Sequence, residues 1–166
     1  MAKTFNTTMS NTVRWIGIST VMIVIGAVAI VMSRDAPAVL GVPLAGILTL
    51  ALALSYALSP LRYEMANGRL VIRRQVGRST VELRGAVIHA DSDAFKGLVR
   101  VFGNGGFFAF DGLFYSRRLG MVKVAARHRD HGVVIQPPSG RKVLVSPDDA
   151  EAFIAAAIGE GALLSH

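Results

Sequence analysis

Residues 15–32 read WIGISTVMIVIGAVAIVM and residues 37–58 read PAVLGVPLAGILTLALALSYAL, and neither run contains a charged side chain. As helices these runs would measure about 27 and 33 Å, which matches the roughly 30 Å hydrocarbon thickness of a bilayer. Only residues 33–36 separate the two runs. The sequence therefore predicts a transmembrane helical hairpin over residues 15–58, with spans at 15–32 and 37–58.

The segment before the hairpin, residues 1–14, is rich in Thr and Asn, and we expect a disordered tail there. A cleaved signal peptide is the alternative reading, because Ala27 and Ala29 form a small-x-small cleavage pattern. The apolar run is longer than the core of a signal peptide, and a second full-length run follows it. Both features favour the hairpin over the signal peptide.

Basic residues next to the spans predict the orientation of the hairpin. Lys3 and Arg14 precede the first span, Arg34 stands beside Asp35 in the loop, and five arginines follow the second span within residues 62–78. Because Lys and Arg concentrate on the cytoplasmic side, both termini should be cytoplasmic in a multi-pass protein of the cell (inner) membrane. The predicted interface anchors on that side are Trp15 and Tyr56.

The rest of the chain is basic and has no cysteine. Residues 59–166 carry 15 Lys and Arg against 10 Asp and Glu, within a whole-chain net charge of +7. Next to a bilayer, this charge is expected to meet anionic headgroups. This part of the chain has no RNA-stacking motif and no basic helix, so the sequence predicts no nucleic-acid partner.

Residues 59–159 have the pattern of a small β-rich domain. Apolar residues alternate on both sides of Asn67–Gly68, the strongest short signal for a β-hairpin. Further short strands follow, which gives about seven in all. Ser146 and Pro147 then open an amphipathic helix whose apolar face runs from Ala150 to Ile158. Residues 160–166 are expected to be a tail.

These features resemble the bacterial PH-domain (pleckstrin-homology-like) membrane proteins. The resemblance covers about residues 60–158, and it rests on segments 63–72 (YEMANGRLVI) and 97–114 (GLVRVFGNGGFFAFDGLF), on Gly120, and on the segment 146–154 with its Ser-Pro-Asp start and Phe153–Ile154. It implies an α+β chain: the hairpin, a PH-like antiparallel β-barrel, and a C-terminal helix that caps the barrel. The family implies no enzyme activity.

Two groups of residues are the candidate contacts with a membrane or a partner. Phe107 and Phe108 lie in a glycine-rich aromatic segment, either as core residues of a hairpin or as a flap on the bilayer or a partner helix. Arg117 and Arg118 are expected beside that hairpin. The tight Asn67–Gly68 turn leaves no room for an inositide pocket.

The sequence predicts no catalytic site, no metal site and no cofactor. The glycine-rich segment lacks the GK[ST] ending of a phosphate-binding loop. The pair His128 and His131 lies among cations in a turn, which disfavours a metal, and Asp91 and Asp93 lack the rest of a calcium loop.

We therefore expect a membrane-anchored, non-catalytic binding module that recognises an anionic phospholipid or another membrane protein at the cytoplasmic face. The alternative is an accessory or structural subunit of a larger membrane complex.

Overall fold

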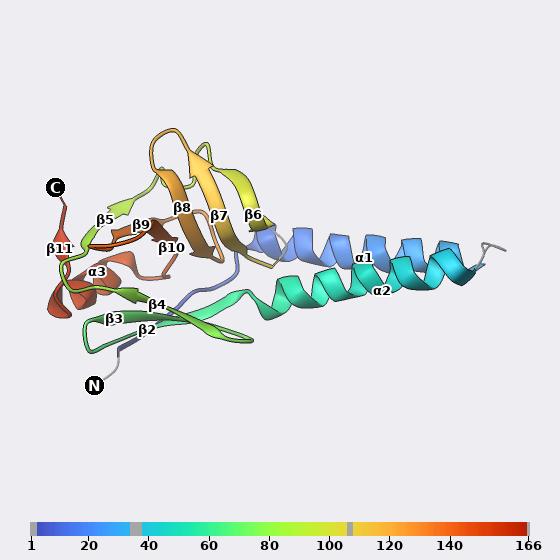
Figure 1. The fold of residues 1–166 in the computed structure, drawn as a ribbon, viewed down its shortest axis with the longest axis horizontal. Coiled ribbons are helices and arrows are strands. Elements are labelled where there is room, and N and C mark those ends of the chain that lie inside the picture. Colours follow the sequence, from blue (N-terminus) through green and yellow to red (C-terminus); the bar gives the residue numbers. More distant parts are fainter. Residues whose placement is uncertain (1–2, 34–37, 106–107, 166) are drawn as a thin grey trace.

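The computed structural model describes residues 3–33, 38–105 and 108–165. Two long helices, α1 (Asn11–Ser33) and α2 (Ala38–Ala57), run side by side and project from a β-rich body (Figure 1). Apolar side chains cover their outer surfaces; Ile23 is 70% exposed and Ile47 64%. Both predicted helices are confirmed as helices.

Whether the two helices form a transmembrane hairpin is a separate point. Among the described residues, one helical stretch, Asn11–Ile30, is long and apolar enough to cross a bilayer. The described apolar part of α2, Val42–Ala57, is shorter. The chain is thus α+β with N-terminal helices, and the two-span hairpin is taken up below as a proposal.

The first sheet is an antiparallel meander with an additional N-terminal strand. In sheet order its strands are β1 (Lys3–Asn6), β2 (Pro60–Ala66), β3 (Arg69–Arg74) and β4 (Arg78–Glu82). The turn between β2 and β3 is Asn67–Gly68, and both residues have positive φ, 55° and 73°. The predicted hairpin is therefore confirmed, in the backbone conformation that Asn and Gly tolerate best.

Residues 3–14 differ from the expected disordered tail. Strand β1 pairs with β2 in a register that sets Phe5 opposite Tyr63. The Phe5 ring packs edge-on against Phe153 with the centroids 5.3 Å apart. Strand pairing and the packing of Phe5 thus order part of a Thr- and Asn-rich segment, which composition alone does not reveal.

The second sheet has seven strands. In sheet order they are β11 (Leu163–Leu164), β5 (Val87–Asp91), β9 (Gly132–Gln136), β10 (Lys142–Val145), β8 (Gly120–Ala126), β7 (Phe110–Ser116) and β6 (Val99–Gly105). Strand β10 runs parallel to β8, and β11 runs parallel to β5.

This topology corrects the expected antiparallel barrel of about seven strands. The described strands form two open sheets rather than a closed barrel. The described part of the predicted tail, residues 160–165, contains a strand pairing, because Leu163 donates its N–H to the carbonyl of Ala86 at 2.7 Å. Hairpin patterns reveal neighbours joined by a turn, whereas the β10–β8 and β11–β5 pairs join segments far apart in sequence.

The C-terminal helix α3 (Ala150–Gly159) is confirmed, with a different cap. The N-cap is Asp149, whose carboxylate accepts the N–H of Ala152 at 2.9 Å. Ser146 is buried and serves another role, described below. Phe153 is fully buried in the core to which both sheets contribute, so α3 packs against that core.

An ion pair connects the two sheets near the helices. The guanidinium of Arg74 on β3 contacts both carboxylate oxygens of Asp111 on β7, at 3.1 and 2.9 Å, and donates to Ser79 at 2.9 Å. Both charged side chains are nearly buried, with 10% and 12% exposed. Bidentate pairing with little solvent makes this contact sensitive to the loss of either partner.

We expect Asp111→Asn to lower the free energy of unfolding by about 3–5 kcal/mol, because Arg74 is left buried without its counter-charge. The matched control is Glu82→Gln, which removes the exposed Arg69–Glu82 pair and should cost about 0–1 kcal/mol. Urea denaturation of the full chain in detergent measures both. Equal losses in the two variants would contradict the role given to Asp111.

Candidate functional site

The helices and the β-rich body meet at a junction built around Phe108. This ring packs edge-on against Tyr56 of α2, with the centroids 5.5 Å apart. It also lies over Gly17 of α1, where an added Cβ would come within 3.0 Å of the ring. Phe108 has a φ of 62°, a left-handed conformation that costs about 1–2 kcal/mol. The β6–β7 connection therefore contacts both helices.

Of the two phenylalanines predicted as contacts in this aromatic segment, the structure describes one. Phe108 rests on the chain's own helices, as a member of the junction. Phe107 lies outside the described residues.

Further contacts hold the end of α2. The N–H of Val76, in the β3–β4 turn, donates to the carbonyl of Ala57 at 2.9 Å. The side-chain amide of Asn104 on β6 donates to the carbonyl of Ser55 at 3.4 Å. Val76 follows a strand of the first sheet and Asn104 lies on a strand of the second. The last turn of α2 is therefore hydrogen-bonded to both sheets.

The two predicted interface anchors lie at the same end of the helix pair. Trp15 is in the first turns of α1 and is 66% exposed, and Tyr56 is in the last turn of α2 and is 48% exposed. The Tyr56 hydroxyl also accepts a hydrogen bond from Gln75 at 3.3 Å. Both rings are thus available to a surface at the base of the helices.

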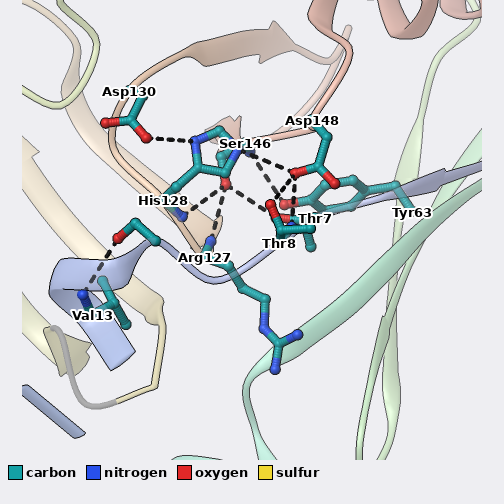
Figure 2. A network of polar contacts seen from close by, with 10 residues as sticks. Thr7, Thr8, Val13, Tyr63, Arg127, His128, Asp130, Ser146 and Asp148 are labelled. Carbon is teal, nitrogen blue, oxygen red and sulfur yellow. Dashed lines mark hydrogen bonds and ion pairs between the residues drawn. The ribbon is translucent and has the colours of Figure 1, made fainter. Parts of the chain in front are cut away.

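A polar network connects the start of α1 to the body (Figure 2). Thr8 donates its N–H and its hydroxyl to one carboxylate oxygen of Asp148, at 2.7 and 2.9 Å. In return the N–H of Asp148 donates to the carbonyl of Asn6 at 3.1 Å. The segment that joins β1 to α1 is therefore fixed to the segment that precedes α3.

Tyr63 and Ser146 form the buried base of this network. The Tyr63 hydroxyl donates to the carbonyl of Ala125 at 2.7 Å and accepts the N–H of Ser146 at 3.2 Å. The Ser146 hydroxyl oxygen accepts the N–H of Arg127 at 2.9 Å. Burial raises the pKa of the Tyr63 phenol above its ordinary value of 10.0, because the phenolate would lose its hydration.

His128 completes the network without forming a catalytic arrangement. Its Nε2 lies 3.7 Å from Asp148 and its Nδ1 lies 3.9 Å from Asp130, beyond hydrogen-bonding distance. Ser146 is fully buried and occupied by backbone N–H groups. This cluster supports the fold and offers no accessible nucleophile.

Arg117 and Arg118 lie in the exposed turn between β7 and β8. They border a hollow of about 570 Å³ that Lys96, Asp93 and Tyr115 also line. Arg118 forms an ion pair with Asp91. The hollow is therefore basic at its rim, with part of its charge already neutralised.

The structure does not bring these arginines beside Phe108. Phe108 comes just before β7 and Arg117 just after it, and the seven residues of β7 span roughly 23 Å. The turn with Arg117 lies at the end of the sheet away from the helices (Figure 1). The expectation that they lie together is therefore wrong, because the strand between them runs straight through.

The residues that sequence reasoning missed are those that join elements. Arg74 looks like one more cation at a solvated strand edge, yet it pairs with Asp111. The available signal was the pair Arg73–Arg74, since neighbouring strand residues point to opposite faces. Arg73 indeed pairs with Glu64 instead, and this pairing holds the pKa of Glu64 below its usual value.

The described residues contain no group of three or more His, Cys, Asp or Glu side chains that could hold a metal ion. The Asp91 and Asp93 carboxylates each serve an ion pair, with Arg118 and Lys96 respectively.

A family model described as "Bacterial PH domain" matches residues 61–159, which is more than half of the chain. The comparison with curated proteins gives no match, and neither does the comparison with solved structures.

Gly17→Leu should expel the Phe108 ring and loosen the β6–β7 connection, because the new side chain would occupy the position of the ring. Amide hydrogen exchange in residues 108–112 of the full chain in detergent should become faster. The control is Gly26→Leu, since an added Cβ there meets nothing within 4 Å. Unchanged exchange in Gly17→Leu would contradict the junction.

Tyr63→Phe should lower the free energy of unfolding by about 1–3 kcal/mol at neutral pH, because it leaves a buried carbonyl and a buried N–H without their partner. The raised pKa adds a pH effect. The folded state holds the phenol proton more tightly than the unfolded state, so stability is complete below pH 10 and falls as the pH rises above it.

Denaturation measured from pH 7 to 11 tests both effects. Tyr63→Phe should lose part of the alkaline decline. Tyr115→Phe, at a side chain that is 46% exposed, is the control for loss of a hydroxyl and should keep the wild-type free energy of unfolding at neutral pH. Identical pH profiles in wild type and Tyr63→Phe would exclude Tyr63 as a source of the decline.

Proposed function

The chain belongs to the bacterial PH-domain family, and on this premise we propose that it is a membrane-anchored, non-catalytic binding module. Domains of this family are typically binding modules without catalytic activity. In our proposal α1 and α2 cross the cell (inner) membrane as a hairpin, and the domain recognises a partner at the cytoplasmic face.

One observation carries this proposal: the apolar helix pair is fixed to the domain at both of its attachments. Thr8 is held by Asp148 at the start of α1, and Val76 contacts Ala57 at the end of α2. A helix pair with exposed apolar surfaces needs an apolar surrounding. A bilayer supplies it, and it then lies directly next to the domain.

The distribution of charge supports a multi-pass topology with both termini in the cytoplasm. Lys3 and Arg14 stand before the predicted first span, and the arginine-rich β2–β4 segment follows the second. Trp15 and Tyr56 would then lie at the cytoplasmic headgroup level as interface anchors. Phe108 would sit between the two helices at the same level.

A protein partner is favoured over an anionic lipid. The candidate lipid contacts Arg117 and Arg118 lie at the end of β7 away from the helices, and Arg118 is paired with Asp91. Attraction to anionic headgroups falls off within a Debye length, about 10 Å at 0.1 M salt. The β2–β3 loop is the tight Asn67–Gly68 turn, which offers no inositide pocket.

One observation favours the second candidate function, an accessory subunit of a larger membrane complex. An added Cβ at Gly26 or Gly46 meets nothing within 4 Å. These glycines therefore do not serve α1–α2 packing, and they leave room for close approach by a helix of another protein.

Alkaline carbonate extraction of cell membranes tests the anchoring. The wild-type chain should stay in the membrane. The double variant Ile23→Arg and Leu50→Arg should become extractable, because each Arg near the middle of a span costs about 2.5–3.5 kcal/mol. The control Val76→Arg changes an apolar side chain that is 65% exposed on the domain, and it should leave the chain in the membrane.

Because the chain has no cysteine, a single Ser139→Cys label reports the side on which the domain lies. Membrane-impermeant maleimide should label it in inverted vesicles and not in intact spheroplasts. Extraction of the wild-type chain by carbonate, or labelling in spheroplasts, would contradict the proposed anchoring or orientation.

A further inference from the structure

Part of one face of the second sheet packs against the first sheet. On that face Asn104, Asp111 and Ala125 form one cross-strand row. Asp111 pairs with Arg74 of the first sheet, and Ala125 belongs to the core between the sheets. This row is therefore covered.

The next two rows of the same face are less covered, because Leu113 and Lys123 are half-buried and the other residues are exposed. The strand register places Leu113 between Phe102 and Lys123, and Tyr115 between Val99 and Met121. We call the five apolar residues of these rows the apolar shelf. Four of them are exposed: Phe102 by 78%, Val99 by 63%, Tyr115 by 46% and Met121 by 38%.

The apolar shelf ends at an unpaired sheet edge. Strand β6 is the last strand of its sheet among the described residues, and six of its seven residues are exposed. Adjacent exposed apolar side chains on a free edge are unusual in a monomer, and they mark interaction surfaces. Phe102 and Tyr115 are the aromatic side chains that interfaces favour.

One end of the apolar shelf is continuous with α2. Phe102 lines a groove of about 320 Å³ together with Leu54 and Leu58, at the C-terminal end of that helix. If α2 spans the membrane as proposed, the shelf begins at the bilayer surface and leads away from it.

The other end of the apolar shelf is basic. Val99 and Tyr115 line the 570 Å³ hollow with Lys96, Arg117 and Arg118. Lys96 and Arg118 are paired with Asp93 and Asp91. Arg117 is exposed and forms no salt bridge within the part of the chain that the structure describes. Lys123 adds a further cation at the flank of the Leu113 row.

We propose that the apolar shelf docks the juxtamembrane segment of an integral membrane protein, at the point where that segment leaves the bilayer beside α2. This inference rests on the proposed function. The docked segment is apolar against Phe102, Leu113 and Tyr115, and acidic where it reaches Arg117. The continuity with α2 specifies a partner in the same membrane, and the basic end specifies its charge.

Two other occupants fit less well. Lipid chains stay in the hydrocarbon region, whereas the apolar shelf leads from Leu58 toward the turn at Arg117, away from the helices. A second copy of this chain would bring the same cations to the interface, and like charges placed opposite each other destabilise pairing.

Photo-crosslinking of the full chain in its native membranes tests the proposal. The photoreactive residue p-benzoylphenylalanine replaces Phe102 or Tyr115, and Val76 as the control outside the shelf. Positions 102 and 115 should form an adduct with a detergent-extracted protein, and position 76 should not. Mass spectrometry should map the adduct to a segment that adjoins an apolar span and contains Asp or Glu.

Charge reversal supplies the second part of the test. Arg117→Glu should reduce the adduct yield from position 102 by about fivefold or more, whereas Arg141→Glu, at an exposed cation outside the shelf, should leave it unchanged. Adducts with lipid only, adducts with a second copy, no adduct, a mapped segment without acidic residues, or equal effects of the two reversals would each overturn the proposal.

The same membranes separate this inference from the proposed function. If the chain resists carbonate extraction but forms no adduct, only the docking proposal is overturned. If carbonate extracts the chain, the proposed membrane anchoring is overturned, and with it the premise of the docking proposal.

Discussion

The very short connection between helix α2 and strand β2 is the constraint on which the rest of the structure depends. Helix α2 ends at Ala57 and strand β2 begins at Pro60, so only Leu58 and Ser59 lie between them. Ser59 is fully buried and donates its hydroxyl to the carbonyl of Tyr56 at 2.8 Å. On the other side, residues 7–10 join β1 to α1, and Thr7 and Thr8 are bonded to the segment before α3. With both connections short and bonded, the domain cannot turn freely about the helices.

The remaining contacts at the junction also hold the domain in one position relative to the helices. Phe108 fills the space over Gly17, and the Arg74–Asp111 pair joins the two sheets on the side of the helices. Strand β1 is part of the first sheet, so the segment that begins α1 is itself part of the domain. A flexible tether would let the domain sample many orientations. This arrangement instead presents one face of the domain toward the base of the helices and holds the apolar shelf at a defined side of α2.

The sequence predicts those features that depend on local patterns. Apolar runs identify both N-terminal helices. Two residue types that tolerate positive φ identify the Asn67–Gly68 hairpin, and the helical spacing of apolar residues identifies α3. It also predicts the PH-like domain through segments such as 97–114. Features that join distant segments are not visible in it: the strand at Phe5, the parallel β10–β8 pair and the pairing of Arg74 with Asp111. The candidate contact residues do not lie together, because residue spacing cannot show that β7 separates Phe108 from Arg117.

The central claim is that the domain has one fixed orientation on its helices. The most direct measurement is the distance distribution between spin labels at Ser19→Cys on α1 and Ser139→Cys in the β9–β10 turn, by pulsed electron paramagnetic resonance on the full chain in lipid nanodiscs. Both positions are exposed, and the chain has no other cysteine. The account predicts a single narrow distribution that broadens in Gly17→Leu. A broad distribution in the wild-type chain would contradict it.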